Sequence, residues 1–333
     1  METFVSIIIV NHNGKLHLDK CMDSLKTTLY SNFEVLVVDN SSTDSSVDLV
    51  KQKYPETKLI ELKKNIGFAA SNNLAAKEAK GDFYIFLNND TVVTKTWLSE
   101  LVKSLTENHD NKVAMAQSLL LRYDGEIDSS GDYIDKFGRP YSSKLKNAPN
   151  GRKILSARAA CMIARKEVFW ELGGFEEDFF ASFEDVHLGW KAWISGYKII
   201  LASNSIVYHS AGQTVKKLEN TMNFHSMKNQ VCIILLNFES PLGIKNLLML
   251  IPSYAPSIKI FRKRNLKKEE KETAAAATYS NPVLLKDIVK TFFWVCTHSL
   301  ILYKKYKVIN QMRVNSTNYL IKIGLVSPNR YEK

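Results

Sequence analysis

The first 120 residues alternate short apolar runs with stretches of helical spacing, and this alternation restricts the fold more than any other feature of the chain. Strands are predicted at residues 4–10, 33–38, 58–62 and 83–87, and helices at residues 16–30, 45–54 and 72–80. Strands separated by helices of about ten to fifteen residues form βαβ units, which build a parallel sheet. The strand at residues 35–38 is apolar on both faces, which favours a sheet with helices on each side. We therefore predict an α/β fold with a mostly parallel, Rossmann-like central sheet.

Charge divides the 333 residues into two parts. Residues 1–215 carry 25 basic and 27 acidic side chains, whereas residues 216–333 carry 20 and 7, so the net charge of +11 comes from the last third. That third has a helical pattern, a basic stretch at residues 259–271 and an amphipathic stretch at residues 284–302. We predict one domain at 1–215 and a helical region at 216–333 that associates with an anionic membrane surface. A solvated basic helix that packs on the first domain is the alternative.

Cysteine usage indicates the compartment. The four cysteines are scattered without a CxxC pair: Cys21, Cys161, Cys232 and Cys296. This pattern fits neither a disulfide framework nor a structural zinc site, and reduced thiols are typical of the cytosol. No run of eighteen apolar residues is uninterrupted. We expect a cytoplasmic protein, peripheral on the inner face of the cell membrane.

Polar residues follow the predicted strands where a ligand pocket is expected. In open parallel sheets the ligand lies beyond the carboxyl ends of the strands. The residues at those ends are 11–13, 39–42, 63–67 and 88–90, all of them rich in small polar side chains. Asp39 could cap the following turn or accept a hydrogen bond from a nucleobase or ribose. Asp90 could form an ordinary turn or bind Mg²⁺ or Mn²⁺, which prefer oxygen ligands.

Two further segments contain candidate residues for the site predicted around Asp90. Glu184 and Asp185 are adjacent carboxylates, a pair whose ionisation tends to differ, which suits one of them to general-base work at neutral pH. The same two residues could simply cap the helix that follows. A further strand is predicted at residues 198–208, and His209 follows it. His209 is either a buried structural histidine or a second metal ligand opposite Asp90.

Six segments together, in this order and spacing, resemble an inverting family 2 glycosyltransferase of the rhamnosyltransferase-like branch. They cover roughly residues 4–215 and read SIIIVNHNG, EVLVVDNSSTDSS, NIGFAASNN, GDFYIFLNNDT, GGFEEDFFASFEDVHLGWK and YHSAG. The resemblance implies a GT-A fold, a nucleotide-diphosphate sugar donor, a bound Mg²⁺ or Mn²⁺, and an acceptor that is a glycan or a polyprenyl-diphosphate-linked sugar. It implies a role in polysaccharide biosynthesis for the cell envelope.

The resemblance also implies a role for individual residues. Asp185 matches the general base, and Asp90 and His209 match the metal ligands. The residues assigned to the nucleotide sugar are Val10, Asn11, Asn13, Asp39, Asn40, Ser41, Asn65, Gly67, Asn73, Asn88, Asn89 and Glu184. Three positions depart from the pattern of the branch: Asn88 replaces the first acid of the metal-binding motif, His187 stands in place of an aspartate, and Lys191 in place of an arginine.

Two functions of other classes compete with the enzyme. The basic last third suggests a nucleic-acid-binding protein, but it has no recognisable reader motif and the aspartates at the pocket rim oppose phosphate, so no nucleic-acid partner is expected. The incomplete metal motif permits a catalytically silent subunit that binds a sugar nucleotide within a glycan assembly complex. We predict the glycosyltransferase.

Overall fold

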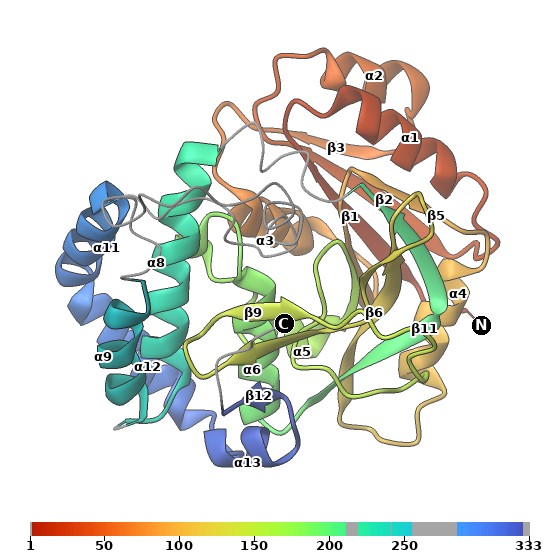
Figure 1. The fold of residues 1–333 in the computed structure, drawn as a ribbon. Coiled ribbons are helices and arrows are strands. Elements are labelled where there is room, and N and C mark those ends of the chain that lie inside the picture. The colour runs from red at the N-terminus through yellow and green to blue at the C-terminus, as the bar shows by residue number, and fades with distance from the viewer. Residues whose placement is uncertain (1, 211–218, 241, 255–284, 329–333) are drawn as a thin grey trace, which may run out of the picture.

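The fold was analysed in a computed structural model of the chain. The structure describes residues 2–210, 219–240, 242–254 and 285–328. Figure 1 shows an α/β part, which runs from red to green, and a group of C-terminal helices beside it.

A nine-stranded sheet forms the centre of the α/β part. Its strand order is β3-β2-β1-β4-β10-β6-β11-β5, and β7 pairs with β6. Strands β3, β2, β1, β4, β6 and β11 run parallel, whereas β10, β5 and β7 run antiparallel to their neighbours. The strands are β1 (Val5–Asn11), β2 (Phe33–Asp39), β3 (Lys58–Glu61), β4 (Phe83–Leu87), β5 (Thr91–Val93), β6 (Val113–Leu121), β7 (Ile127–Ser129), β10 (Cys161–Arg165) and β11 (Lys198–His209). The predicted mostly parallel sheet is confirmed.

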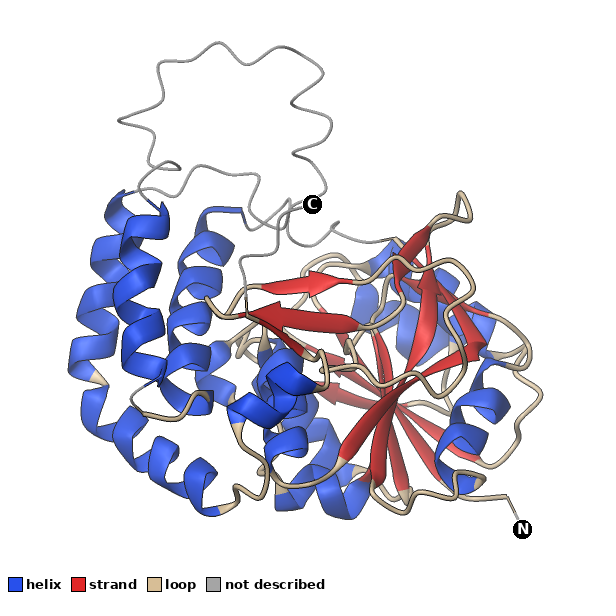
Figure 2. Ribbon diagram, turned by 60° about the horizontal axis from the view of Figure 1, so that its bottom comes forward, coloured by secondary structure: helices blue, strands red, loops and turns tan. Residues whose placement is uncertain are grey.

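Helices cover both faces of this sheet (Figure 2). Alternate residues of β1 enter different hydrophobic clusters: Ile7 and Ile9 pack on one face, and Ile8 packs on the other. Because side chains alternate across a strand, a run of apolar residues fills both layers at once. The first layer contains α1 (Lys15–Leu25), α2 (Ser46–Lys53) and α4 (Trp97–Thr106), and the second contains α3 (Phe68–Glu78), α5 (Lys166–Glu171) and α6 (Glu184–Ile194).

Helix α3 begins at Phe68, four residues before its predicted start. Gly67 precedes it with φ of +89°, a conformation that glycine adopts without strain. The backbone N–H groups of Phe68 and Ala69 both donate to the carbonyl of Phe180, at 2.6 and 3.2 Å. A distant carbonyl thus satisfies the first N–H groups of the helix, a contact that local sequence does not reveal.

Residues 122–153, which are polar and rich in glycine and proline, contain short strands. Besides β7 they form β8 (Asp132–Asp135) and β9 (Pro140–Ser142). A second sheet has the order β12-β8-β9, in which β12 (Val326–Ser327) comes from the far end of the chain. Strands of two to four residues carry almost no periodic signal, and β12 is distant from β8 in sequence, so local sequence does not reveal this sheet.

The described residues of the last third of the chain are mainly helical, as predicted. Its described helices are α8 (Glu219–Asn237), α9 (Leu242–Tyr254), α11 (Leu285–Thr297), α12 (Ser299–Gln311) and α13 (Thr317–Lys322). Helices α9, α11 and α12 pack around α8 (Figures 1 and 2). The amphipathic stretch at 284–302 divides between α11 and α12, and the basic stretch at 259–271 lies outside the described residues.

The C-terminal helices share a hydrophobic core with the α/β part. Ile233 of α8 and Phe238, the residue after this helix, belong to the same cluster as Ile8 and Trp190, and the rings of Trp190 and Phe238 lie 4.7 Å apart. Lys305 of α12 forms ion pairs of 2.6 Å with Glu176 and Asp178 of the α/β part. Within the described ranges, no helix has the length and hydrophobicity needed to cross a bilayer.

Candidate active site

The carboxyl ends of β1 and β2 hold the first group of predicted site residues. Asn11 and Asp39 are partners in register, and Asn11 Nδ2 lies 3.4 Å from Asp39 Oδ1 and 3.2 Å from Ser42 Oγ. Asp39 Oδ2 accepts a hydrogen bond of 2.9 Å from the backbone N–H of Ser42, which fixes the turn after β2. Asn11 Oδ1 accepts from Asn89 Nδ2 at 2.7 Å. Asn11 therefore connects the turn after β2 to the turn after β4.

Two more turns extend this edge into a rim. Asn13 Oδ1 accepts from the N–H of Thr43 at 2.7 Å, so the turn after β1 is bound to the turn after β2. Asn40 Nδ2 donates to Asn65 Oδ1 at 2.9 Å, and Asn65 Oδ1 also accepts from the N–H of Gly67 at 2.9 Å. The Ser41 hydroxyl lies 3.5 Å from the carbonyl of Lys63. Five residues predicted to bind the nucleotide sugar thus lie along one continuous rim: Asn13, Asn40, Ser41, Asn65 and Gly67.

Two other residues predicted to bind the nucleotide sugar do not take part in these rim contacts. Asn73 is buried, and its side chain bonds Phe175 through both amide groups, at 2.8 and 3.0 Å. Val10 is within β1 and packs partly against the hydrophobic cluster that contains Ile8. Both residues support the rim from behind in this structure.

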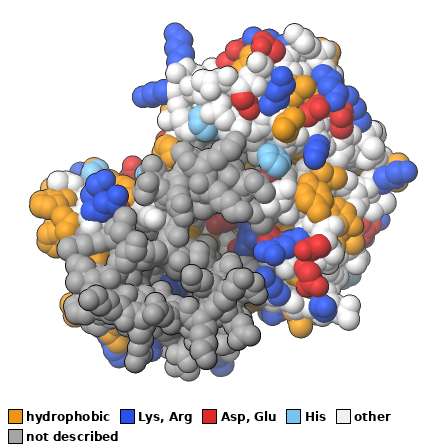
Figure 3. Space-filling view, turned by 45° about the horizontal axis from the view of Figure 1, so that its top comes forward, with side chains coloured by type: hydrophobic (Ala, Val, Ile, Leu, Met, Phe, Trp, Pro, Cys, Tyr) orange, Lys and Arg blue, Asp and Glu red, His pale blue; other side chains and the backbone are white. Residues whose placement is uncertain are grey.

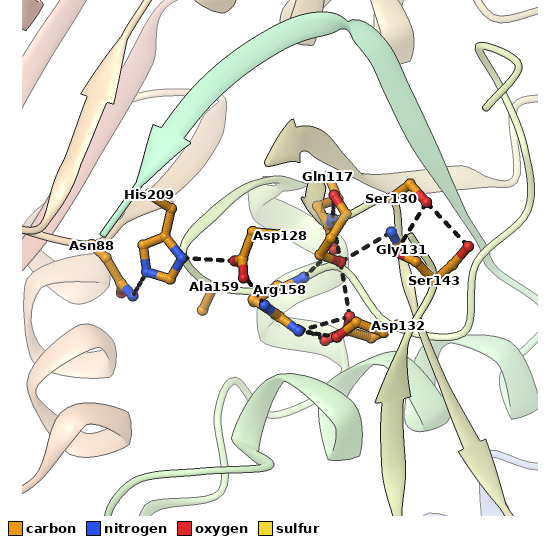
Figure 4. Close-up of polar contacts among 12 residues, drawn as sticks. Asn88, Gln117, Asp128, Ser130, Gly131, Asp132, Ser143, Arg158, Ala159 and His209 are labelled. Carbon is orange, nitrogen blue, oxygen red and sulfur yellow. Dashed lines mark hydrogen bonds and ion pairs between the residues drawn. The ribbon is translucent and has the colours of Figure 1, made fainter. Parts of the chain in front are cut away.

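Asp90 and His209 meet at the end of β4 and β11. His209 Nε2 lies 3.3 Å from Asp90 Oδ1 and 3.5 Å from Asn88 Nδ2. Its other nitrogen, Nδ1, lies 2.9 Å from Asp128 Oδ2 (Figure 4). A carboxylate on Nδ1 orients the imidazole, as is common behind metal-binding histidines. The geometry thus turns Nε2 towards Asp90.

Electrostatics keep a proton on this imidazole when no cation is bound. Burial lowers the pKa of His209, but hydrogen bonds to Asp128 and Asp90 outweigh burial and raise the pKa to about 9. A divalent cation would take the place of that proton, since metal ligands must be deprotonated. The described residues contain no group of three or more His, Cys, Asp or Glu side chains arranged around one ion. Asp90 and His209 are the candidate ligands here, and a cation held by these two would need its remaining ligands from a bound phosphate and water.

A network behind His209 was not predicted. Arg158 donates to Asp128 Oδ2 at 3.0 Å, and to both carboxylate oxygens of Asp132 at 3.0 Å (Figure 4). The backbone N–H of Arg158 donates to Gln117 Oε1 at 2.8 Å. Burial raises the pKa of Asp128, but His209 and the Arg158 guanidinium hold it at about 2. The network therefore keeps an ionised carboxylate behind the imidazole.

One sequence signal could have identified this network. Arg158 lies in a run of small residues, SARAA at 156–160, that leads into a buried strand. A buried arginine requires a buried acid, so an isolated arginine in such a run predicts a carboxylate partner. The partners, Asp128 and Asp132, could not be chosen among the many acids of the chain without the fold.

Asp185 lies at the other end of this network. It is in the first turn of α6, where Oδ2 accepts from the N–H of Ala159 at 3.2 Å and Oδ1 from the N–H of Val186 at 2.7 Å. Ala159 directly follows Arg158, so the carboxylate is attached to the same loop as the guanidinium. Glu184 is 5% exposed, and its Oε2 has no hydrogen-bond partner among the described residues.

The two adjacent carboxylates differ in ionisation. Burial, reinforced by the charge of Asp185, raises the pKa of Glu184 well above its ordinary range. Burial and the charge of Asp132 raise the pKa of Asp185 to about 6, although the Ala159 amide and Arg158 favour its ionised form. These shifts favour the protonated form of Glu184 and leave Asp185 the more acidic of the two, which makes Asp185 the better candidate for a base at neutral pH.

The four side chains on which the sequence argument depends come together. Asp90 contacts His209, His209 contacts Asp128, Asp128 contacts Arg158, and the residue after Arg158 binds Asp185. Asp39 joins through Asn11 and Asn89, the neighbour of Asp90. His187 and Lys191, two departures from the resembled family, are instead 1% and 5% exposed. The Lys191 ammonium donates to the carbonyls of Leu172 and Gly174.

Comparison with known proteins shows which family the chain resembles. The profile of a family described as "Glycosyl transferase family 2" matches residues 6–173, half of the chain. The chain is 32% identical over 220 residues to "O-antigen biosynthesis protein RfbC" of Myxococcus xanthus, an alignment that covers 62% of this chain and 17% of that protein. It is 22% identical over 244 residues to "N-acetylglucosaminyl-diphospho-decaprenol L-rhamnosyltransferase" of Mycobacterium tuberculosis, covering 64% of this chain and 78% of that one.

A solved structure extends the likeness to the fold. The mannosyltransferase PcManGT of Pyrobaculum calidifontis, solved with GDP-Man and Mn²⁺, superimposes with a TM-score of 0.53 at 18% identity and covers 96% of this chain and 86% of that one. The central sheet with helices on both faces is therefore the GT-A type, as the sequence predicts.

Proposed function

The chain belongs to glycosyl transferase family 2, and on this premise we propose that it transfers a sugar from a nucleotide-diphosphate sugar to a hydroxyl group of a glycan acceptor, with inversion. The convergence of Asp39, the Asp90–His209 pair and Asp185 on one edge of the sheet supports this proposal above all other observations. In it, residues 1–215 carry the chemistry, and residues 216–333 hold the enzyme at the inner face of the cell membrane.

The donor would lie along the rim. Asn11, Asp39 and the turns that they fix offer amide and carboxylate groups for a nucleobase and ribose. Asp90 and His209 would hold a divalent cation, Mg²⁺ or Mn²⁺. When bound, such an ion neutralises the charge that develops on a departing diphosphate. The relatives support a donor and a cation of these classes, because PcManGT was solved with GDP-Man and Mn²⁺.

Asp185 is the proposed general base. It takes the proton of the acceptor hydroxyl as that oxygen attacks the anomeric carbon of the donor sugar. A carbon–oxygen bond forms on one side of this carbon, the bond to the diphosphate breaks on the other side, and the diphosphate leaves with the electron pair. Attack opposite the leaving group inverts the anomeric centre. The lower pKa of Asp185 compared with that of Glu184 supports this role.

A panel of nucleotide sugars tests the function. Nucleoside diphosphate release is measured with thymidine, uridine and guanosine donors, with Mg²⁺ or Mn²⁺, and with or without a lipid-linked acceptor. We expect acceptor-dependent release with at least one donor. Donor binding without release across the panel would instead identify a catalytically silent subunit.

Substitution of the base tests its assignment. Positioned general-base catalysis contributes roughly 10²- to 10⁴-fold, so Asp185→Asn should reduce turnover at least about 100-fold while donor affinity remains. Asp124→Asn is the matched control, since Asp124 is an exposed carboxylate in the turn after β6. Near-normal turnover by Asp185→Asn would exclude Asp185 as the base.

The C-terminal helices support a membrane-bound acceptor, such as a polyprenyl-diphosphate-linked sugar. Large apolar side chains are exposed on α11 and α12, among them Phe292 at 65%, Phe293 at 63% and Leu300 at 76%. Figure 3 shows hydrophobic side chains and a basic residue gathered at the edge of the molecule that these helices form, on the left. Aromatic side chains enter the interface of a bilayer, and each nearby lysine adds about 1 kcal/mol on an anionic surface.

Vesicle co-sedimentation with the full chain tests this surface. The wild type should sediment with phosphatidylglycerol vesicles, and the double variant Phe292→Ser, Phe293→Ser should remain in the supernatant. The control double variant Leu16→Ser, Leu29→Ser changes residues that are 77% and 68% exposed on the α/β part and should sediment normally. Equal sedimentation of all three proteins would contradict a membrane role for α11.

A further inference from the structure

The turn before Asp185 has an unusual backbone. Phe180, Ser182 and Phe183 have φ values of 62°, 73° and 71°, and none of them is glycine. Side chains other than glycine are disfavoured in this left-handed region, and a phenylalanine is especially uncommon there. Three such residues within four positions require outside contacts to hold them, because strained backbone persists only where the surrounding structure determines it.

Asn229 of α8 supplies such contacts. Its Nδ2 lies 2.9 Å from the carbonyl of Phe179, 3.0 Å from that of Ala181 and 2.6 Å from that of Ser182. Asn229 is 0% exposed, and its Oδ1 has no hydrogen-bond partner among the described residues. The opposite amide orientation would aim Oδ1 at three carbonyl oxygens, so the donor side must face the turn. The buried amide thus serves the turn and nothing else in the described part of the chain.

The same turn contacts both halves of the site. The carbonyl of Phe180 accepts from the N–H groups of Phe68 and Ala69, at the start of α3 and next to the donor rim at Gly67. Phe183 is the residue from which α6 and its Glu184–Asp185 pair begin. A shift of this turn would therefore move the base relative to the rim.

Further contacts seat α8 against this turn. The Lys228 ammonium donates to the carbonyl of Asp178, and the ring of Phe180 stacks on His225 with centroids 4.8 Å apart and planes 19° apart. His225 and Lys228 precede Asn229 on α8, by four positions and by one. Helix α8 therefore presents one contiguous face to residues 178–182.

We propose that Asn229 is a positioning residue for the reaction, which holds the left-handed turn at 179–183 so that Asp185 faces the donor. The C-terminal region thereby forms part of the catalytic unit as well as a surface for a membrane. This inference rests on the proposed function of Asp185, and its test separates the two.

The first test removes the hydrogen-bond donor of Asn229 without changing the shape of the side chain. Asn229→Asp keeps the size of the side chain, but a carboxylate cannot donate to the three carbonyls. A 1 Å misplacement of a reacting group can cost about 100-fold, so kcat should fall roughly 10- to 100-fold while the donor KM changes little. The control is Gln230→Glu, on the next residue of α8, whose amide donates to the carbonyl of Phe137 at 2.7 Å instead. That variant should keep the wild-type kcat per folded protein.

The pH profile of kcat separates positioning from general destabilisation. The charged groups that face Asp185 are Glu184 on its own helix, Asp132 on β8 and Arg158 on the loop before β10. If the turn relaxes, Asp185 loses its bond from the Ala159 amide, which favours the ionised base. The acidic limb should then move to higher pH in Asn229→Asp. A loss of folded protein alone would lower the rate equally at every pH.

Rescue by glycine completes the test. Glycine adopts φ of +73° without strain, so Ser182→Gly added to Asn229→Asp should recover kcat at least severalfold. If Asn229→Asp does not fold, Asn229→Ala with and without Ser182→Gly replaces it. Wild-type kcat and pH profile in the Asn229 variants, with Asp185→Asn inactive, would overturn this inference alone. An Asp185→Asn enzyme of normal activity would overturn the proposed base instead.

Discussion

Removal of the Arg158 guanidinium is the most direct perturbation of the network behind the site. Three contacts of 3.0 Å join it to Asp128 and Asp132, whose side chains are 8% exposed, whereas the arginine side chain is 25% exposed. Arg158→Met keeps much of the apolar stem but leaves the almost buried Asp132 without its cation, and leaves Asp128 with the His209 imidazole alone. The variant thus isolates the charge from the packing of the side chain.

The loss of folding free energy follows from this burial. Removing one partner of a buried ion pair costs about 3–5 kcal/mol, because the remaining charge is left without compensation. Since a quarter of the Arg158 side chain reaches water, we expect the lower end of that range, about 3 kcal/mol. Urea unfolding at pH 7 measures the change as a shift of the midpoint.

Two further variants make the result specific. Lys53 also joins two aspartates, Asp19 and Asp23, at 2.7 Å each, but its side chain is 39% exposed. Lys53→Met should therefore change stability far less than Arg158→Met. Asp132→Asn added to Arg158→Met removes the uncompensated charge and should restore part of the loss. Equal effects of the two cation variants, or no restoration, would refute burial as the source of the energy.

Four other predictions test the site at separate points. The acidic limb of the pH profile of kcat should lie near pH 6, because burial raises the pKa of Asp185 and the protonated base is inactive. A limb near pH 4 would contradict the raised pKa of Asp185. Because burial raises the pKa of Asp185 in the folded protein, its ionised form at pH 7 lowers the free energy of unfolding. Asp185→Asn should therefore unfold at a higher urea concentration than the wild type at pH 7. Asp90→Ala should abolish the Mn²⁺-dependent part of donor affinity in calorimetry, and unchanged affinity would remove Asp90 from the cation site. Gly67→Ala should lower the free energy of unfolding by roughly 1–3 kcal/mol. The reason is that φ of Gly67 is +89° and a Cβ there would lie 2.6 Å from the ring and the carbonyl of Phe180. An unchanged free energy of unfolding would show that Phe180 can move away from the added methyl group.

The sequence predicted β1, β2 and β4 because these strands are rich in apolar residues on both faces. The runs at β1, β2 and β4 needed no partner to be identified, and the polar residues at their ends then followed from the rule that ligands lie there. Asn11, Asp39 and Asp90 were found in this way, and the structure joins them through Asn89.

The parts that escaped prediction depend on partners far away in sequence. Strand β8 consists of four residues, and its pairing with β12 joins segments that no local pattern connects. Arg158 and Asp128 lie beside this second sheet, so their roles in the site were invisible until the fold brought them to His209. Asn229 escaped for the same reason, because its three contacts lie 47 to 50 residues earlier in the chain.

The pairing of β12 with β8 also bears on how the protein is made. Residues 136–325 separate the two strands, so the ribosome must deliver nearly all of that stretch before the small sheet can close. Contacts between such distant segments form slowly, since the closure entropy must be overcome first. Asp132, the partner of Arg158, lies in β8, so this ion pair stands beside a sheet that gains its last strand only after residue 325 has been made.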